Sequence, residues 1–380
     1  MGLLADLLGD YTLRNVAIGA AILGAVSGAL GCFALLRRQS LLGDTLSHAA
    51  LPGICLGFLI AGSRSLGPIL VGALISGALA GLAVIFLIRM TRLKTDAALG
   101  IALSLFFAGG IVLLTLIQRQ AGAAQAGLES FLFGQAAAIL PRDLWVMGAI
   151  AAVALGAVAL CWKEFKLASF DPVFAQTLGL PVAVLEAALT VLVALAVVIG
   201  LQMVGVVLMA AMVIAPAAAA RQWVGRLGHM VLLAALFGIL AGVGGAGISA
   251  LQPGLATGPL IVLIAAGLVA VSILFAPGRG VLWEMAARAR ERADLQGRQI
   301  LATFRDLARD HGDPAYPVER GMLDTYHGAK TSRELDKLAA EGLIAPASHM
   351  PMEGEHWVLT EKGLRETEDL AMPKSFPSHV

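Results

Sequence analysis

The feature that most constrains this chain is a series of apolar runs, each close to the length of a membrane-spanning helix. An α-helix needs about 20 mostly apolar residues to cross the hydrocarbon core of a bilayer. The sequence contains nine such runs, at residues 15–36, 45–61, 66–88, 96–117, 143–162, 184–201, 203–220, 229–250 and 258–276. The chain is 58% hydrophobic and 14% charged, whereas soluble domains usually carry about 25% charged residues. The sequence therefore predicts an all-α polytopic membrane protein with about eight or nine transmembrane helices.

Charge divides the chain into two regions. Residues 1–280 contain 14 of the 27 Lys and Arg residues and 9 of the 26 Asp and Glu residues, so this region has a net charge of +5 and the remainder −4. The change of composition falls near "FAPGRG" (275–280). We expect a transmembrane domain at 1–278, an amphipathic linker helix at 279–312 and a small domain at 313–380.

Basic residues between the apolar runs predict the orientation, because short cytoplasmic loops are enriched in Lys and Arg. With nine spans, five basic groups fall on one side: Arg37/Arg38, Arg89/Arg92/Lys94, Lys163/Lys166, Arg221/Arg226 and Arg279. Arg64, Arg119 and Arg142 fall on the other side. This pattern predicts an N-terminus outside the cell and a cytoplasmic C-terminal domain.

Asp44 and His48 are ionisable residues inside one of the apolar regions. On a helix, side chains four residues apart are neighbours, so a carboxylate and an imidazole at this spacing could share one divalent cation. The same spacing suits a proton relay, or an internal hydrogen bond that steadies a helix end. Arg38 is close in sequence, so the charge rule places Asp44 near the cytoplasmic face.

Other polar positions in or near the spans are weaker candidates. Gln202 lies between two apolar runs and is a candidate pore-lining residue. Met203 and Pro216 are further candidates, with helix packing the alternative for Met203 and a helix kink the alternative for Pro216. Glu186 follows Pro181 at the start of a span, where a helix dipole favours a carboxylate.

The segment "SFDPVFAQTLGLPV" (169–182) lies between two spans on the predicted cytoplasmic side. Asp171 before Pro172 is a helix-start signal, and Gly179 followed by Leu-Pro is a stop signal. The pattern predicts a short helix on the cytoplasmic face. Such a helix is either a docking element for a soluble partner or an ordinary loop helix.

Taken together, these residues identify a family. The chain resembles, over about residues 15–277, the permease subunits of bacterial ABC transporters that take up zinc, manganese or iron. Five stretches carry the resemblance in the family's order: "RRQSLLGDTLSHAALPGICLGFL" (37–59), "LKTDAALGIALSLFFAGG" (93–110), "LESFLFGQ" (128–135), "SFDPVFAQTLGLPV" (169–182) and "MVGVVLMAAMVIAPAAAA" (203–220).

The resemblance implies roles for particular residues. Asp44 and His48 match the motif through which such permeases handle the metal. The coupling helix that contacts the ATPase is implied within 169–182, at Phe170, Asp171, Pro172, Phe174, Ala175, Gly179 and Leu180. The family often has an acidic residue after the Asp-Pro pair, and here Val173 stands there. This departure implies an ATPase contact with fewer charges.

The resemblance also implies the working assembly. The chain would be a non-enzymatic permease in the bacterial inner membrane, with a cytoplasmic ABC ATPase, an extracytoplasmic metal-binding protein and a second permease copy or paralogue as partners. Mn, Zn or Fe would be its transported substrate, with no permanent cofactor. The sequence has no G-x-x-x-x-G-K-[ST] phosphate loop, so the ATPase must be a separate chain. The alternatives are a proton-coupled secondary metal transporter and a membrane-tethered metal-responsive regulator.

The C-terminal region predicts a small α+β domain. Residues 281–311 read as an amphipathic helix with an apolar face at Leu295, Ile300, Leu301, Phe304 and Leu307. A helix capped by Thr331 or Ser332 and stopped at Gly342, a hairpin and a last helix follow, an order that resembles the winged-helix domains of metal-dependent repressors. The net charge of −4 argues against nucleic acid as a partner.

The histidines of this region are a candidate metal-sensing group, and scattered solvated histidines are the alternative. The residues in question are His311, His327, His349 and His356, with Glu353 and Glu355.

Overall fold

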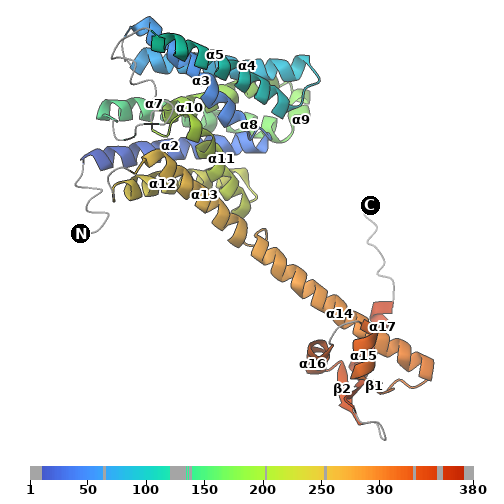
Figure 1. Cartoon of the computed structure of the whole chain (residues 1–380). Helices are drawn as coiled ribbons and strands as arrows, with labels where there is room; N and C mark the ends of the chain where they lie inside the picture. The colour runs from blue at the N-terminus through green and yellow to red at the C-terminus, as the bar shows by residue number, and fades with distance from the viewer. Residues whose placement is uncertain are drawn as a thin grey trace. The chain divides into compact units, whose positions relative to one another are not determined.

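The computed structural model describes residues 11–62, 66–119, 134, 136, 139–201, 203–251, 255–327, 331–348 and 354–371. The chain divides into two compact units, Met1–Val281 and Leu282–Val380. The first unit is helical, and the second combines helices with a small sheet (Figure 1).

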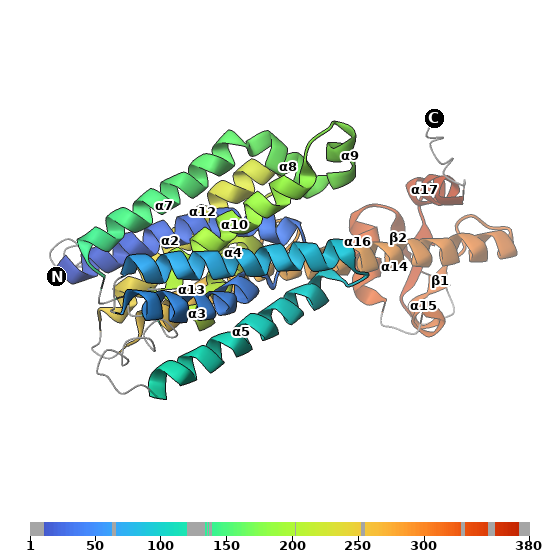
Figure 2. The same cartoon turned by 90° about the horizontal axis from the view of Figure 1, so that it is seen from above.

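Within the described residues, nine helices are long and apolar enough to cross a membrane. They are α2 (Tyr11–Leu36), α3 (Leu42–Ala61), α4 (Leu66–Met90), α5 (Thr95–Arg119), α7 (Pro141–Leu160), α10 (Val182–Leu201), α11 (Val206–Trp223), α12 (Leu227–Ser249) and α13 (Thr257–Phe275). These nine candidate membrane helices agree with the predicted eight or nine spans. The helices run alongside one another as a bundle (Figure 2).

Small residues let the backbones of neighbouring helices in this bundle approach closely, as is common in membrane proteins. Helix α2 packs against α12, α11, α7 and α10, while α3 packs against α4, α5 and α11. A Cβ atom added at Gly24 of α2 would overlap the carbonyl oxygen of Gly238 in α12. These contacts hold α3, the helix that carries Asp44 and His48, between α4, α5 and α11.

Two short helices follow α7, and both belong to the segment predicted to lie outside the apolar runs. Helix α8 spans Trp162–Phe170, and α9 spans Pro172–Thr177. The ring of Phe165 in α8 packs edge-on against Phe33 of α2, with ring centroids 6.4 Å apart. Helix α8 is therefore anchored on the end of the bundle's central helix.

The second unit begins with the long helix α14 (Val281–His311). Then follow β1 (Val318–Glu319), α15 (Arg320–His327), α16 (Ser332–Ala340), β2 (Ile344–Ala347), β3 (His356–Leu359) and α17 (Glu361–Ala371). The strands form one antiparallel sheet in the order β1-β3-β2, with Val318 opposite Trp357 and Ile344 opposite Leu359.

The core of this unit uses the second half of α14. Ile300, Leu301 and Phe304 are buried together with Leu323, Leu335 and Leu338. Leu295 had been expected on the same apolar face, but its residue surface is 59% exposed. At about 100° per residue, it points roughly 140° away from Ile300 and roughly 180° away from Phe304, so it lies on the opposite face of α14.

Helix α16 begins and ends near its predicted bounds, although its start is held differently. Gly342 has φ 74° and follows the end of the helix, as the stop signal predicted. Thr331 precedes the helix, but its side chain makes no capping hydrogen bond. Instead, its hydroxyl and its backbone N–H both donate to Oδ1 of Asp324, which ties α16 to α15.

Candidate functional site

Asp44 and His48 lie side by side in the first two turns of α3. Asp44 Oδ1 is 3.3 Å from His48 Nε2, and their side chains are 33% and 19% exposed. Two metal bonds of about 2.1 Å to atoms this far apart enclose an angle of about 104°, close to tetrahedral. The separation therefore allows the pair to offer one oxygen and one nitrogen ligand to a single cation.

Neighbouring helices restrict the orientation of His48. Its ring meets Phe107 of α5 edge-on, with centroids 4.8 Å apart. Its Nδ1 atom is buried and has no hydrogen-bond partner among the described residues. Thr45, on the same turns of α3, donates its hydroxyl to the Leu99 carbonyl oxygen at 3.3 Å. Helix α5 thus fixes both the rotation of α3 and the position of the imidazole.

The packing of α3 on α4 gives the depth of the pair. Ser76 donates to the Ala49 carbonyl oxygen at 2.6 Å, and Gly53 meets Gly72. This antiparallel register places Asp44 level with Gly81, and α4 continues from there to Met90. At 1.5 Å per residue, about 13 Å of α4 extends beyond the level of Asp44. The pair therefore lies within the bundle, deeper than its sequence distance from Arg38 indicated.

The two candidate ligands would not complete a metal centre by themselves. Within the described part of the chain, no group of three or more His, Cys, Asp or Glu residues is placed to hold a metal ion. A structural zinc site would require four protein ligands. A site with two protein ligands leaves coordination positions for water or a second chain, which suits an ion that must also be released.

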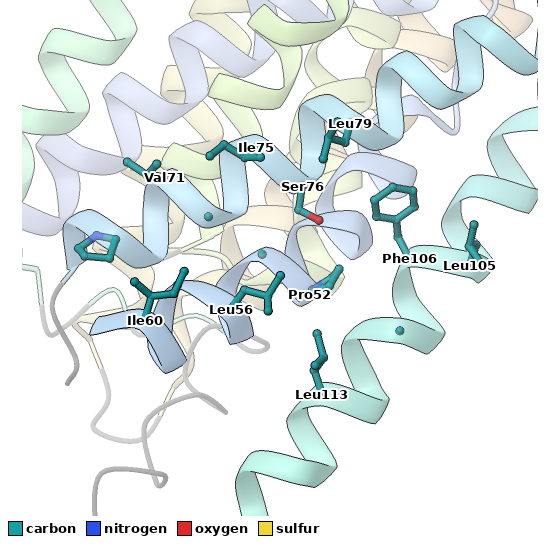
Figure 3. A pocket seen from close by; sticks show the side chains of 15 residues that line it. Pro52, Leu56, Ile60, Val71, Ile75, Ser76, Leu79, Leu105, Phe106 and Leu113 are labelled. Atoms are coloured by element: carbon teal, nitrogen blue, oxygen red, sulfur yellow. The ribbon is translucent and has the colours of Figure 1, made fainter. Parts of the chain in front are cut away.

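A cavity of about 620 Å³ lies between α3, α4 and α5. Its lining is almost entirely apolar, and Figure 3 shows Leu56, Ile75 and Leu113 among the side chains of the three helices that surround it. The hydroxyl of Ser76, which also lines it, is already bonded to Ala49. The cavity therefore offers no ligands for a cation, although Pro52 at its edge follows His48 by four residues on the same face of α3.

The candidate pore-lining residues are placed as follows. Gln202 lies outside the described residues. Met203 is 1% exposed, and its sulfur lies 3.0 Å from where a Cβ atom of Gly19 would stand. Pro216 is buried inside α11. A role of these residues in permeation stays a prediction.

The predicted coupling segment contains a short capped helix. Asp171 precedes α9, and its carboxylate Oδ1 accepts the backbone N–H of Phe174 at 2.9 Å, while Pro172 occupies the first turn. Gly179 has φ 79°, a conformation that favours glycine. Next to it, the Leu180 N–H donates to the Ala175 carbonyl oxygen at 3.1 Å. The chain thus reverses sharply on both sides of α9.

One side of the α8–α9 segment is buried and the other is apolar but exposed. Ala175 is fully buried and packs with Ala168 and Val182. The exposed fractions of the outward residues are 57% for Phe170, 70% for Val173, 51% for Phe174 and 59% for Leu178. Sequence reasoning did not assign a role to Leu178. An exposed apolar group on a rigid turn is typical of a protein docking surface.

Sequence reasoning also missed an ion-pair group at the end of the bundle. Glu186 of α10 accepts from Arg89 at 3.0 Å and lies 3.8 Å from Arg37. Burial lowers the pKa of Arg37, and the charge of Glu186 opposes that effect. Glu186 is the fifth residue of α10, and two arginines, rather than the helix dipole alone, stabilise its carboxylate. Nothing in the sequence spacing signalled that these residues meet.

The comparison with known proteins is consistent with this architecture. Residues 9–276 match the family model of the ABC 3 transport family. The zinc transport system membrane protein TroC of Treponema pallidum is 47% identical over 290 residues, covering 76% of this chain and 97% of that protein. The manganese transport system membrane protein MntC of Bacillus subtilis is 46% identical over 286 residues, covering 75% of this chain and 66% of that protein.

A solved structure of PsaBC from Streptococcus pneumoniae in complex with Fab is also similar. The match has a TM-score of 0.64 at 33% sequence identity, and covers 73% of this chain and 96% of that chain. The matched share agrees with the extent of the helical bundle rather than with the full chain. On its sequence and on its fold, the chain belongs to the ABC 3 transport family.

Proposed function

We propose that this chain is the membrane permease subunit of an ATP-driven importer of a divalent metal ion, Mn²⁺, Zn²⁺ or Fe²⁺. The observation that carries the proposal is the Asp44–His48 pair, whose facing oxygen and nitrogen lie 3.3 Å apart inside the bundle. The relatives named for zinc and manganese transport support the same class of substrate. The metal is cargo, and the permease holds no permanent cofactor.

The mechanism we infer is alternating access. The ion arrives from an extracytoplasmic metal-binding protein, binds between Asp44 and His48 with water or a second permease completing its coordination, and leaves when the bundle opens inward. Mixed oxygen and nitrogen ligands suit these borderline cations. A histidine held by α5 and an aspartate beside it on α3 favour one ion position, whereas the open coordination positions favour release.

The energy comes from a separate cytoplasmic ABC ATPase. We place its contact on the α8–α9 segment, because the apolar side chains there are exposed and the turn at Gly179 holds them rigidly. A second permease copy or a paralogue forms the other half of the translocation unit. In this arrangement the bundle lies in the bacterial inner membrane, and Asp171 and Pro172 face the cytoplasm.

We assign the C-terminal region to the same side of the membrane, with 279–312 as the connecting helix and 313–380 as a winged-helix-like domain. The element order α14-β1-α15-α16-β2-β3-α17 supports the assignment of a winged-helix-like domain. Its acidic charge favours a docking or regulatory role over nucleic-acid binding. His311 stacks on Tyr316, His327 bonds Thr303, and His356 bonds Gly354. These separate partners favour individual structural roles over a shared sensing site; His349 lies outside the described residues.

Uptake of radioactive Mn²⁺, Zn²⁺ and Fe²⁺ tests the proposal. Cells carry this permease with its ATPase and binding protein, and wild type is compared with Asp44→Ala and His48→Ala. We expect uptake of one metal to collapse in both variants while the amount of permease in the membrane is unchanged. Ser47→Ala is the control, since its hydroxyl bonds only the Asp44 carbonyl of its own helix.

Undiminished uptake in both variants would overturn the assignment of the pair. A second arm inactivates the phosphate loop of the partner ATPase. Uptake that persists in that strain would point instead to a proton-coupled transporter.

A further inference from the structure

A second cavity, of about 380 Å³, lies at the end of the bundle where α4 reaches Met90. Its walls come from the end of α2 and the α2–α3 connection, from the last turns of α4 and from the start of α10, together with Thr95 of α5, Ala168 and Ser169 of α8 and Pro172 of α9. It is distinct from the Asp44–His48 pair, which lies deeper in the bundle. All of its walls belong to the first compact unit.

Positive charge dominates this cavity. Arg37, Arg38 and Arg89 line it, with Glu186 as the acidic residue among its described walls. The Arg37 side chain is 9% exposed, and its Nη2 atom lies 3.8 Å from Oε1 of Glu186. The other carboxylate oxygen of Glu186 accepts a hydrogen bond from Arg89 at 3.0 Å. One carboxylate is therefore the counter-charge for two guanidinium groups. A buried charge that is only partly compensated favours a further anion.

Arg38 adds a third charge without adding a partner. It makes no ion pair with any described residue, and its backbone has φ 57°. A left-handed conformation is unfavourable for a residue with a side chain and persists where the surrounding structure enforces it. Here the backbone bonds of Arg38 to Leu35 and of Gln39 to Ala34 enforce the turn. The turn places two consecutive arginines at the same cavity.

Gln39 contributes an unused acceptor. It is 7% exposed, and its Oε1 atom has no hydrogen-bond partner among the described residues. A buried acceptor without a donor is unfavourable by about 1–3 kcal/mol in typical proteins. A ligand with a hydroxyl group beside its anionic group would satisfy Gln39 and the arginines together.

Besides Thr95 and Ser169, which carry hydroxyl groups, the uncharged walls are mostly apolar, and three of them belong to the long helices α2 and α4. Leu36 is the last residue of α2, and Ile85 and Ile88 lie in the last turns of α4. Cationic side chains next to apolar ones at a helix end match the level where phospholipid headgroups meet acyl chains, and basic pockets between transmembrane helices are known to bind anionic headgroups.

We propose that this cavity binds the phosphoglycerol headgroup of an anionic phospholipid. The phosphate lies against Arg37 and Arg38, a glycerol hydroxyl donates to Gln39 Oε1, and the lipid's glycerol backbone lies against Ile85 and Ile88. The lipid thereby connects the segment that leads into α3 with Pro172 at the start of α9. The proposal does not depend on which metal the chain carries.

Native mass spectrometry of the full-length chain, delipidated in detergent and titrated with phosphatidylglycerol, tests this site. We expect wild type to bind one phosphatidylglycerol more tightly than zwitterionic phosphatidylethanolamine. Removing the charge in Arg38→Gln should weaken phosphatidylglycerol binding by at least about tenfold, the lower end of the usual range for a hydrogen bond to a charged group. Arg92→Gln is the control, because Arg92 lies near the same helix end outside the cavity. Arg37→Lys keeps a charge and should retain most of the binding.

Two further arms identify the ligand. Gln39→Leu should remove a preference for phosphatidylglycerol over phosphatidic acid, which lacks the glycerol hydroxyl of the headgroup. Soluble glycerol phosphate should bind much more weakly than the lipid, since it leaves the apolar walls uncovered. The proposal is overturned if Arg38→Gln binds the lipid as Arg92→Gln does, or if soluble glycerol phosphate binds as tightly as the lipid.

Discussion

Gly53 of α3 and Gly72 of α4 lie backbone against backbone, so that a Cβ atom on either would overlap the carbonyl oxygen of the other. The contact fixes the register of the helix that carries Asp44 and His48 against its neighbour. Four residues away along α3, Ala49 accepts the Ser76 hydroxyl in the same register. The depth of the Asp44–His48 pair therefore depends on two glycines that contribute no chemistry of their own.

The first prediction concerns this contact. Gly53→Ala should force α3 and α4 apart and lower the stability of the bundle by about 1–3 kcal/mol, the usual effect of overpacking. Gly100→Ala in α5 is the matched control, since nothing lies within 4 Å of a Cβ atom there; it should be neutral or stabilising. Thermal unfolding in detergent measures the stability of both variants. Equal unfolding midpoints would contradict the close packing of α3 on α4 at Gly53.

The second prediction separates metal binding from transport. Asp44→Asn and His48→Gln should each weaken Mn²⁺ or Zn²⁺ binding to the purified chain by at least about tenfold, because each removes one of the two proposed protein ligands. Asp96→Asn is the control, since Asp96 is likewise an acid in the first turn of a helix. Equilibrium dialysis measures the affinity. Binding lost equally in the control would mean that a diffuse negative charge, not a ligand pair, holds the metal.

The third prediction addresses the capped helix α9. Asp171→Ala removes the acceptor for the Phe174 N–H and should destabilise the helix by about 1 kcal/mol, whereas Asp171→Ser retains a capping oxygen. We expect metal-stimulated ATPase activity of the reconstituted transporter to fall in the alanine variant and to persist in the serine variant. The basal activity of the isolated ATPase is the reference. Identical behaviour of the two variants would contradict a role for the cap.

The fourth prediction concerns the ion-pair group at Glu186. Glu186→Gln leaves Arg37 without its counter-charge in a place where its side chain is 9% exposed, and should lower stability by about 2 kcal/mol. Arg89→Gln should have a smaller effect, since Arg89 is 43% exposed and water compensates for the lost pair. Differential scanning fluorimetry in detergent compares them. A larger loss in Arg89→Gln would contradict the burial of Arg37.

The fifth prediction contrasts two residues of α14. Phe304 is 1% exposed and Leu295 is 59% exposed, so Phe304→Ala should destabilise the C-terminal unit by about 3–5 kcal/mol and Leu295→Ala by little. Limited proteolysis of the full chain, followed by an antibody to its C-terminus, reports this difference. Equal resistance to protease would contradict the packing of α14 on α15 and α16.

Sequence patterns predicted most of the fold, because each span is a local feature. A run of about 20 apolar residues predicts a helix wherever it packs, so α2 and α13 are recognisable without any knowledge of their neighbours. The same holds for α9, where Asp171, Pro172 and Gly179 lie within one short segment. Thr331 was assigned less well, since its preferred partner, Asp324, belongs to a different helix.

The sequence by itself determined that the chain spans a membrane, that an acidic region follows the spans, and that Asp44 and His48 are neighbours. All of these depend on residues close together in the chain. Only the tertiary structure decided how deep the pair lies and which residues surround it, because the register of α3 on α4 depends on Gly53 meeting Gly72. It also decided that Arg37, Arg89 and Glu186 share one cavity, since charges on a turn and on two separate helices meet only after the helices have packed.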